Sequence, residues 1–291
     1  DYGVNDPNVD QMWGFEKMNV DKYFRYLRKN KIKPKKKARI AILDTGVDGK
    51  HEDLQGNFVS TRPKYDIDKQ THGTHCAGIA AAVSNNGKGV ASLSLDQKFV
   101  EVTSVKVLSD YGWGTQDDII RGMIEAADGG ADVISMSLGG PARGNARRAY
   151  EEAIKYANKS GAIVVVAAGN SNKNARDYIP ASCKGVITVS ALDNNLNRAK
   201  FSNWVSDMEM GIAAPGVDIL STVPGNKYTA YSGTSMATPY VAGLLGIMKS
   251  LDPEMDTKKA FNLLKENGFE TKDTPKTGKM INPLKTVESI K

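Results

Sequence analysis

Apolar residues along the chain follow two patterns that alternate. Short and nearly continuous apolar runs, typical of strands buried on both faces, occupy residues 39–43, 100–108, 131–138, 162–168 and 186–191. Longer segments with the length of helices occupy residues 72–82, 115–128, 146–160, 234–250 and 257–266. Strands that alternate with helices predict a parallel sheet covered on both faces. The expected fold is a doubly wound, mostly parallel α/β sheet in a single domain.

A basic amphipathic segment precedes the first strand. Its apolar residues recur at the i, i+3, i+4 and i+7 positions of a helix: Val20, Tyr23, Phe24 and Leu27. Ten bases and no acid lie between residues 22 and 39: Lys22, Arg25, Arg28, Lys29, Lys31, Lys33, Lys35, Lys36, Lys37 and Arg39. The chain has 39 bases and 33 acids, a net charge of +6, so without these ten it would carry a net charge of −4. The basicity is therefore local.

Two interpretations of this basic segment remain open. A solvated helix and loop that lead into the sheet would have this composition, and so would a surface for an acidic partner, a cell-wall polymer or a membrane surface. We see no pattern of aromatic residues set for stacking on bases, so no nucleic-acid partner is expected. No apolar run reaches the roughly 18 to 20 residues that cross a bilayer, so no transmembrane segment is expected.

The segment 231–239 places a serine where a helix begins. Ser235 follows Gly233, which allows a sharp turn, and precedes an apolar run typical of a buried helix. The first turn of a helix offers free backbone N–H groups and the positive end of the dipole, which would stabilise negative charge on a substrate oxygen. A buried helix with a capping Ser or Thr explains the same pattern, so this segment alone does not identify a nucleophile.

An acid and a histidine in two other segments favour the catalytic interpretation. Asp44 ends an apolar strand before a Thr-Gly turn, and His72 opens a helix of small residues. A serine hydroxyl becomes a good nucleophile when a base takes its proton, and an acid orients that base and stabilises its charge. Catalytic zinc is not expected here, because the segment from His72 to His75 lacks the glutamate of the HExxH zinc helix.

At these residues the sequence resembles the subtilisin-like serine proteases. Four motifs of that family are present: DTG around Asp44, HGTHCAG from His72, VVVAAGN ending at Asn170 and GTSMATP around Ser235. The aspartate, histidine and serine also follow one another in the family's order. The motifs are nearest in style to the bacterial subtilisin and thermitase branches and to the proteinase K branch. The resemblance spans essentially the whole chain.

The resemblance implies a serine endopeptidase. Ser235 would be the nucleophile, His72 the general base and then acid, and Asp44 the residue that orients His72. Asn170 would donate to the oxyanion. Residues 1–291 would form one peptidase domain, with an N-terminal segment at 1–38 and the catalytic core at 39–291. A processing or macrocyclising peptidase with a narrow substrate is one alternative. A catalytically idle peptide-binding module is another, and the intact set of four residues disfavours it.

The resemblance also implies a groove for an extended peptide. Two segments would hold the peptide between them as an added strand, with main-chain hydrogen bonds for affinity and side-chain pockets for selectivity. The implied groove residues are Leu108, Gly112, Trp113, Gly114, Gln116, Ile119, Ser137, Leu138, Gly139, Ala167, Ala168, Gly169 and Tyr178. No single acidic pocket for Lys or Arg stands out, although Asp110 and Asp177 leave that open. A broad or apolar preference is therefore expected.

Calcium is the cofactor that the resemblance implies. The loop 83–90 resembles the family's calcium loop, and its Asn and Gly composition suits an ion that prefers oxygen ligands. The implied ligands are Asp6, Asp53, Val83, Asn86, Lys88 and Val90, with Asn85 as the alternative to Asn86. An ordinary Asn-Gly turn would explain the loop alone, and the conjunction with the two aspartates favours calcium.

Maturation and location are further expectations from the family. We expect an N-terminal prodomain that is removed from a zymogen, a secreted or cell-surface mature form, and a monomer. The chain opens on Asp1 rather than Met, which is typical of a trimmed product. Cys76 and Cys183 are expected to be two buried thiols, His75 a structural residue and His51 a surface loop residue.

Overall fold

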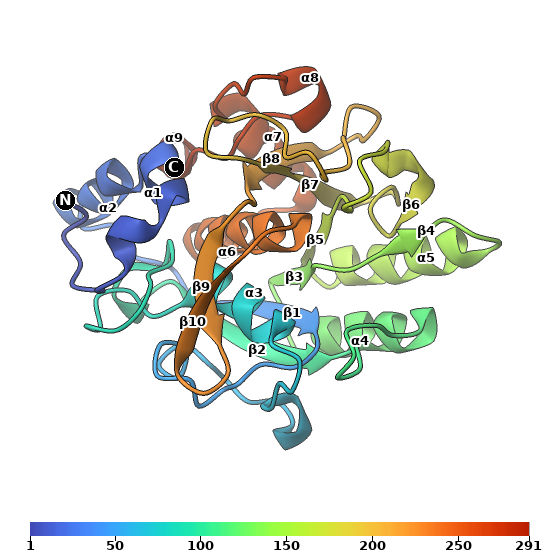
Figure 1. Ribbon diagram of the computed structural model, residues 1–291, viewed down its shortest axis with the longest axis horizontal. Helices are drawn as coiled ribbons and strands as arrows, with labels where there is room; N and C mark the ends of the chain where they lie inside the picture. The colour runs from blue at the N-terminus through green and yellow to red at the C-terminus, as the bar shows by residue number, and fades with distance from the viewer. Residues whose placement is uncertain (291) are drawn as a thin grey trace.

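A six-stranded sheet forms the centre of the computed structural model, which describes residues 1–290 (Figure 1). In spatial order its strands are β2 (Val100–Lys106), β1 (Ala38–Asp44), β3 (Val133–Met136), β5 (Ile163–Ala167), β7 (Val186–Leu192) and β8 (Gly211–Pro215). All neighbouring pairs are parallel. The strand order reverses between β1 and β3, and at such a switch point the carboxyl ends of the strands border a crevice.

The sheet separates two apolar cores. Side chains of a strand alternate between its faces, so Ile40 and Ile42 of β1 join one core, whereas Ala41 and Leu43 join the other. The first core contains residues of α3 (His72–Ala81), α6 (Thr234–Leu251) and α7 (Thr257–Asn267). The second contains residues of α4 (Gln116–Asp128) and α5 (Ala146–Lys159). The predicted α/β fold with helices on both faces is confirmed.

Helix α6 is the central helix of the molecule (Figure 1). Nearly every residue in it is buried, and it packs against α3 and against all six strands of the main sheet. Its sequence is apolar around the whole circumference rather than along one stripe, as expected for a helix with neighbours on all sides. The N-terminus of this helix, where Ser235 lies, is therefore held by the rest of the fold.

Shorter elements complete the chain. Two small antiparallel sheets pair β9 (Ile219–Val223) with β10 (Lys227–Tyr231) and β4 (Gly140–Pro141) with β6 (Tyr178–Ile179). Short helices are α1 (Trp13–Lys17), α8 (Thr274–Thr277) and α9 (Pro283–Glu288). Four 3₁₀ turns lie at Val9–Gln11, Pro63–Tyr65, Leu95–Gln97 and Ala175–Asp177. None of the helices in residues 1–290 combines the length and apolar composition needed to cross a membrane.

The N-terminal segment belongs to the same core as the sheet. Helix α2 (Val20–Lys29) buries the four apolar residues that its sequence spacing predicted, and they join the core that contains Ile40. Helix α2 packs against α1 and α9, so both ends of the chain lie at the same side of the molecule (Figure 1). The basic face of α2 points to solvent.

The ten elements predicted from the apolar pattern are all present, and every bound lies within two residues of its prediction. The strand predicted at 131–138 is shorter, and Ser137 and Leu138 lie beyond its end. The pattern did not predict β8, β9 and β10. Strand β8 has one large apolar residue, Ile212, among glycine, two alanines and a terminal proline, and β10 is half-exposed with mixed polarity, so neither has the apolar run of a central strand.

Candidate active site

A carboxylate and an imidazole meet at the carboxyl end of the sheet. Asp44 is the last residue of β1, and His72 is the first residue of α3. The imidazole Nδ1 of His72 lies 2.7 Å from Oδ1 of Asp44, close enough for an N–H···O hydrogen bond. The backbone N–H of Thr45 donates to the same oxygen at 2.7 Å. Asp44 is buried, so its carboxylate interacts with His72 with little screening by solvent.

The electrostatics of this pair raise the pKa of His72. Burial of the imidazole lowers its pKa, but the neighbouring carboxylate of Asp44 and the thiol of Cys76 together more than offset this effect, and the pKa of His72 stands well above 6.5. The bond at Nδ1 leaves Nε2 as the nitrogen that can accept a proton. The arrangement is therefore that of a base whose protonated form is stabilised by an adjacent acid.

A second acid, Asp68, which the sequence analysis missed, fixes the start of α3. Oδ2 of Asp68 accepts from the backbone N–H and the hydroxyl of Thr74, at 2.9 and 2.7 Å. Its Oδ1 accepts from the backbone N–H of Thr71 and from the hydroxyl of Thr45, which in turn accepts from Gly73 N–H. Asp68 thus ties the turn after Asp44 to the first turn of the His72 helix. No motif points to it, because it is one of two acids, with Asp66, in a loop of mostly polar residues.

The proline in α6 explains how the backbone of Ser235 is held. Pro239 has no N–H, so the carbonyl of Ser235 lacks its intrahelical partner four residues later. Two side chains from other elements take that place: Ser137 Oγ donates at 2.8 Å and Cys76 Sγ at 3.3 Å. These two bonds attach the start of α6 to α3, through Cys76, and to the end of β3, through Ser137.

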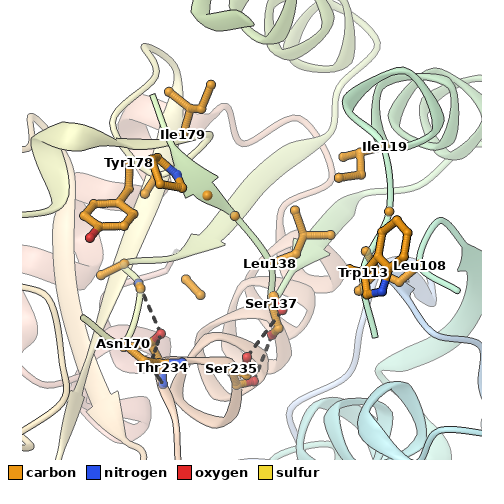
Figure 2. Close-up of a pocket in the computed structure, with 18 of the residues that line it drawn as sticks. Leu108, Trp113, Ile119, Ser137, Leu138, Asn170, Tyr178, Ile179, Thr234 and Ser235 are labelled. Atoms are coloured by element: carbon orange, nitrogen blue, oxygen red, sulfur yellow. Dashed lines mark hydrogen bonds between the residues drawn. The ribbon is translucent and has the colours of Figure 1, made fainter. Parts of the chain in front are cut away.

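The hydroxyl of Ser235 faces the cleft. In this structure Ser235 Oγ donates to the backbone carbonyl of Ser137 at 3.3 Å (Figure 2). Among the described residues, Ser235 Oγ forms no hydrogen bond to His72. Ser235 is the second residue of α6, so its backbone N–H is one of the first-turn groups without an intrahelical acceptor. The serine, the histidine and the helix N-terminus all border one cleft.

Asn170 comes from the loop after β5. Its Oδ1 accepts from the backbone N–H and the hydroxyl of Thr234, both at 2.8 Å. Because both of these groups are donors, the amide nitrogen Nδ2 is the end of the side chain that remains to face the cleft. Gly169 makes this turn with φ of 105°, and a Cβ there would lie 2.4 Å from Nδ2 of Asn203, so only glycine fits.

Metal ligation by the histidine helix is not supported. His75 is buried, and its Nε2 bonds to the carbonyl of Thr229 at 3.0 Å, away from His72. Burial lowers the pKa of His75 to about 4, so the ring is neutral at neutral pH and has the structural role that we expected. Asp44, His72 and Cys76 do place one potential ligand atom each within 4.8 Å of the others, but Asp44 and His72 already bond to each other. Cys76 and Cys183 are buried free thiols, as predicted.

One cleft of about 820 Å³ contains every groove residue that the sequence implied. Leu108, Trp113 and Ile119 lie on one side of it, and Tyr178 and Asn170 lie on the other, with Leu138 and Ser137 between them (Figure 2). Among the described residues, no Asp or Glu lines this cleft, and Arg143 is the only Lys or Arg that does. Asp110 bonds to Lys106 at 3.0 Å instead, and Asp177 is exposed outside the cleft.

Two exposed aromatic side chains belong to the turn that carries one side of the cleft. Trp113 is 68% exposed and Tyr111 is 86% exposed, and both belong to a tight turn closed by hydrogen bonds between Ser109 and residues 112 and 113. Trp113 lines the cleft directly. The sequence analysis named Trp113 and did not name Tyr111, because exposure cannot be read from a lone tyrosine in a loop.

The loop 83–90 encloses two buried aspartates. Oδ1 of Asp53 accepts from the side-chain amide of Asn86 and its Oδ2 from Val90 N–H, both at 2.8 Å. Asp6 Oδ2 accepts from Asn85 N–H at 2.7 Å. Burial is the main cause that raises the pKa of Asp53, to about 8, and the charge of Asp6 contributes to this. The structure therefore brings together all the residues that were implied as calcium ligands, and it is Asn86 that faces Asp53.

The expectation for His51 was wrong. His51 is fully buried under the β9–β10 hairpin, where Nε2 bonds to the carbonyl of Lys227 at 3.0 Å and the ring packs edge-on against Tyr228. Nδ1 accepts from the backbone N–H of Asp53 at 3.1 Å. The polar sequence around His51 resembles a surface loop because the hairpin that covers it lies about 170 residues away in the chain.

A parallel α/β fold that gathers a serine, a histidine and an aspartate beside one cleft is the arrangement of a serine hydrolase. Comparisons with known proteins narrow this class. Residues 35–278 match the model of the subtilase family. The chain belongs to this family and is a subtilisin-like serine endopeptidase.

Relatives of known name agree with this assignment. The chain is 44% identical over 218 residues to thermitase of Thermoactinomyces vulgaris, covering 73% of this chain and 75% of thermitase. It is 39% identical over 250 residues to subtilisin DY of Bacillus licheniformis, covering 83% and 87% of the two chains. A solved protease from Pseudoalteromonas arctica superposes with a TM-score of 0.83 at 28% identity over 99% of both chains.

Proposed function

We propose that Ser235 is the nucleophile of this endopeptidase, with His72 as base, Asp44 as its orienting acid and Asn170 as an oxyanion donor. The observation that carries the proposal is the convergence of four independent elements on one cleft: the end of β1, the start of α3, the loop after β5 and the start of α6. Each contributes the residue type that acyl transfer needs at that point.

In the proposed first step, Ser235 turns from the carbonyl of Ser137 toward Nε2 of His72. His72 takes the hydroxyl proton as Oγ attacks the substrate carbonyl, and the carboxylate of Asp44 stabilises the imidazolium that forms. The Nδ2 group of Asn170 and the backbone N–H of Ser235 donate to the resulting oxyanion. His72 then gives its proton to the leaving amine, and the acyl group stays on Ser235. In the second half of the reaction, His72 takes a proton from a water that attacks the acyl carbonyl, and it returns this proton to Ser235 Oγ as the acid product leaves.

The substrate chain is proposed to lie as an extended strand between residues 112–114 and residues 137–139. Glycines in both segments leave room for a peptide backbone to approach. A broad or apolar preference is supported by the lining, which contains Leu108, Ile119 and Leu138 and no carboxylate among the described residues. Digestion of a peptide library followed by sequencing of the products tests this. Cleavage confined to sites after Lys or Arg, or to one sequence, would contradict the broad preference and favour a dedicated processing peptidase.

Asn170→Ala is expected to lower kcat by about two to three decades with little change in KM. The magnitude is the one known for the corresponding asparagine of subtilisin, a relative of this chain. The physical reason is that the amide donates mainly to charge that develops in the transition state. Steady-state kinetics on one peptide substrate measure both constants. A large rise in KM at unchanged kcat would show that Asn170 shapes the groove instead.

Calcium is proposed to bind between the N-terminal segment and the loop 83–90. Asp53 and Asp6 are both buried, and neither forms an ion pair with Lys, Arg or His among the described residues. Buried carboxylates without a positive partner are costly, so a cation fits this position. Asp6, Asp53, the side chain of Asn86 and the backbone carbonyls of residues 83, 88 and 90 would hold it. When bound, calcium would supply positive charge that ties the N-terminus to the sheet.

A chelator is expected to lower the melting temperature, because calcium would bind the folded chain and not the unfolded one. The stabilisation is about 2.7 kcal/mol at a calcium concentration one hundred times Kd. Without calcium, the pKa of Asp53 is higher in the folded than in the unfolded chain, so the folded state binds more protons and stability falls as pH rises toward 8. The effect of the chelator should therefore be larger at pH 8 than at pH 6.

Calorimetry of three proteins separates a calcium site from a simple turn. The parent should lose stability with chelator, and Asp53→Asn should lose most of its dependence on calcium. Glu266→Gln removes one exposed acid on α7 and should keep the full dependence. If the melting temperature of the parent does not respond to calcium or chelator, the loop is only a turn.

Maturation and location are proposals that rest on the family resemblance. An N-terminal prodomain removed from a zymogen, a secreted or cell-surface mature form and a monomeric state are each what we expect for this chain. Nothing in the fold conflicts with them.

A further inference from the structure

The face of the molecule formed by α2 and the connection to β1 carries bases without acidic partners. Within residues 1–290, Lys36 and Arg39 are the only two of the ten bases between residues 22 and 39 that pair with carboxylates, those of Asp132 and Glu101. Arg28 donates to the backbone carbonyls of residues 2 and 3. The other seven are exposed and form no ion pair among the described residues, and we call them the basic ridge: Lys22, Arg25, Lys29, Lys31, Lys33, Lys35 and Lys37.

The backbone beneath the basic ridge is held in place by the fold. The opposite face of α2 is buried in the core. The connection is attached at both ends: Ile32 N–H donates to Leu27, and Lys35 N–H donates to the carbonyl of Ser250 at 2.8 Å. Like charges that are held together repel one another, and an anion that binds across them relieves this repulsion. The ridge is thus a preformed positive surface.

A groove beside the ridge concentrates this positive potential. It has a volume of about 280 Å³, and its rim carries Arg28, Lys31, Lys33 and Lys98 against one acid, Asp96. Its floor is apolar. A concave surface with low-dielectric walls focuses the field of charges of one sign, so the groove would raise the local concentration of anions.

The composition of the ridge favours one kind of partner. A membrane-binding surface needs apolar side chains that insert between lipids, and a specific protein interface needs an apolar or aromatic centre. The exposed large apolar residues of this protein are Ile67, Tyr111, Trp113, Ile124 and Tyr156, and none belongs to the ridge. A compact anion needs donors that converge on one point. The bases instead follow the chain, first along about 10 Å of helix from Lys22 to Lys29 and then along the connection.

We propose that the basic ridge is a docking surface for a linear polyanion, a flexible polymer with repeated phosphate or carboxylate groups. No residue of the ridge lines the active-site cleft, and α2 lies away from α4, α5 and the β4–β6 pair that flank the cleft (Figure 1). Without the bases of residues 22–39, the chain has a net charge of −4, so the excess of positive charge lies in this one segment. A polymer bound to the basic ridge would therefore leave the active-site cleft open to substrate.

The test is binding of long-chain polyphosphate to the intact protein, measured by titration at low and at physiological salt. The parent should bind, and its affinity should fall steeply as salt rises, because counterions are released on binding. The ridge variant Lys29→Gln, Lys33→Gln, Lys35→Gln and Lys37→Gln should bind at least about tenfold more weakly. A control variant, Lys155→Gln, Lys159→Gln, Lys265→Gln and Lys272→Gln, removes the same charge from α5, α7 and the C-terminal region and should bind as the parent does. Both variants should cleave a small peptide at the rate of the parent.

Two further ligands decide the class of partner. Polyglutamate, measured on Ser235→Ala so that it is not cleaved, tests a carboxylate polymer, and binding of either polymer supports the proposal. Vesicles with anionic lipids test a membrane. Binding to vesicles but to neither polymer would overturn the proposal in favour of a lipid surface. Equal losses in the ridge and control variants would also overturn it, because net charge and not the ridge would then control binding. Absence of polymer binding at low salt would overturn it outright.

Discussion

Replacement of Ser235 by alanine is expected to lower kcat by about six decades while the fold remains intact. This magnitude is known for the catalytic serine of subtilisin, and the remaining rate comes from the oxyanion donors and substrate binding. The change removes only the hydroxyl, which bonds to the carbonyl of Ser137 in this structure. The backbone of residue 235 keeps its own support, because Ser137 and Cys76 bond to its carbonyl and not to its side chain.

Hydrolysis of a peptide substrate and the melting temperature together measure this effect. The matched control is Ser232→Ala, three residues earlier and just before α6, whose hydroxyl accepts from Asp218 N–H outside the cleft. The control should retain nearly full activity. An alanine variant at 235 that unfolds at the parent temperature but still cleaves within tenfold of the parent rate would contradict the assignment of the nucleophile.

Replacement of Asp44 by alanine is expected to lower kcat by about four decades, the size known for the corresponding aspartate of subtilisin. The pH profile should change as well. His72 acts as a base only when it is neutral, so kcat/KM rises with pH through the pKa of His72. In the parent, Asp44 holds that pKa well above 6.5, and activity should therefore be highest at alkaline pH.

Asp44→Asn separates charge from shape in this experiment. The asparagine has the size of aspartate and can keep its oxygen toward Thr45 and His72, where Oδ1 now accepts both bonds. Loss of the negative charge should move the acidic limb of the kcat/KM profile toward lower pH, because the charge of Asp44 is the largest of the effects that raise the pKa of His72. An acidic limb at the same pH in parent and Asp44→Asn would show that another group controls the titration.

The parts of the fold and site that could be predicted are those encoded over short stretches of sequence. Near-continuous apolar runs identified the strands, and the residues that follow them, Asp44 and Asn170, necessarily lie at the carboxyl edge of a parallel sheet. The helical spacing of Val20, Tyr23 and Phe24 predicts the face of α2 that is buried in the structure. The order of the family motifs along the chain then indicated that these residues belong to one catalytic site.

The parts that could not be predicted depend on contacts between distant segments. Pro239 signals that one carbonyl of α6 is free, but the sequence does not say that Ser137 and Cys76 would bond to it. Asp68 is a single acid whose role appears only when the turn after β1 and the start of α3 are side by side. The burial of His51 likewise depends on a hairpin from the C-terminal third of the chain.

The most direct test of the central proposal is covalent labelling with a serine-directed phosphonate or sulfonyl fluoride, followed by mass spectrometry of the digested protein. The reagent is an electrophile: a hydroxyl that a neighbouring base activates attacks its phosphorus or sulfur atom and expels the leaving group, which leaves a covalent label on the oxygen. We predict one label for each molecule, on Ser235, with labelling lost in His72→Ala and slowed by a competing peptide substrate. A label on a different residue, or a parent protein that hydrolyses peptides yet resists the reagent and loses no activity, would contradict the account.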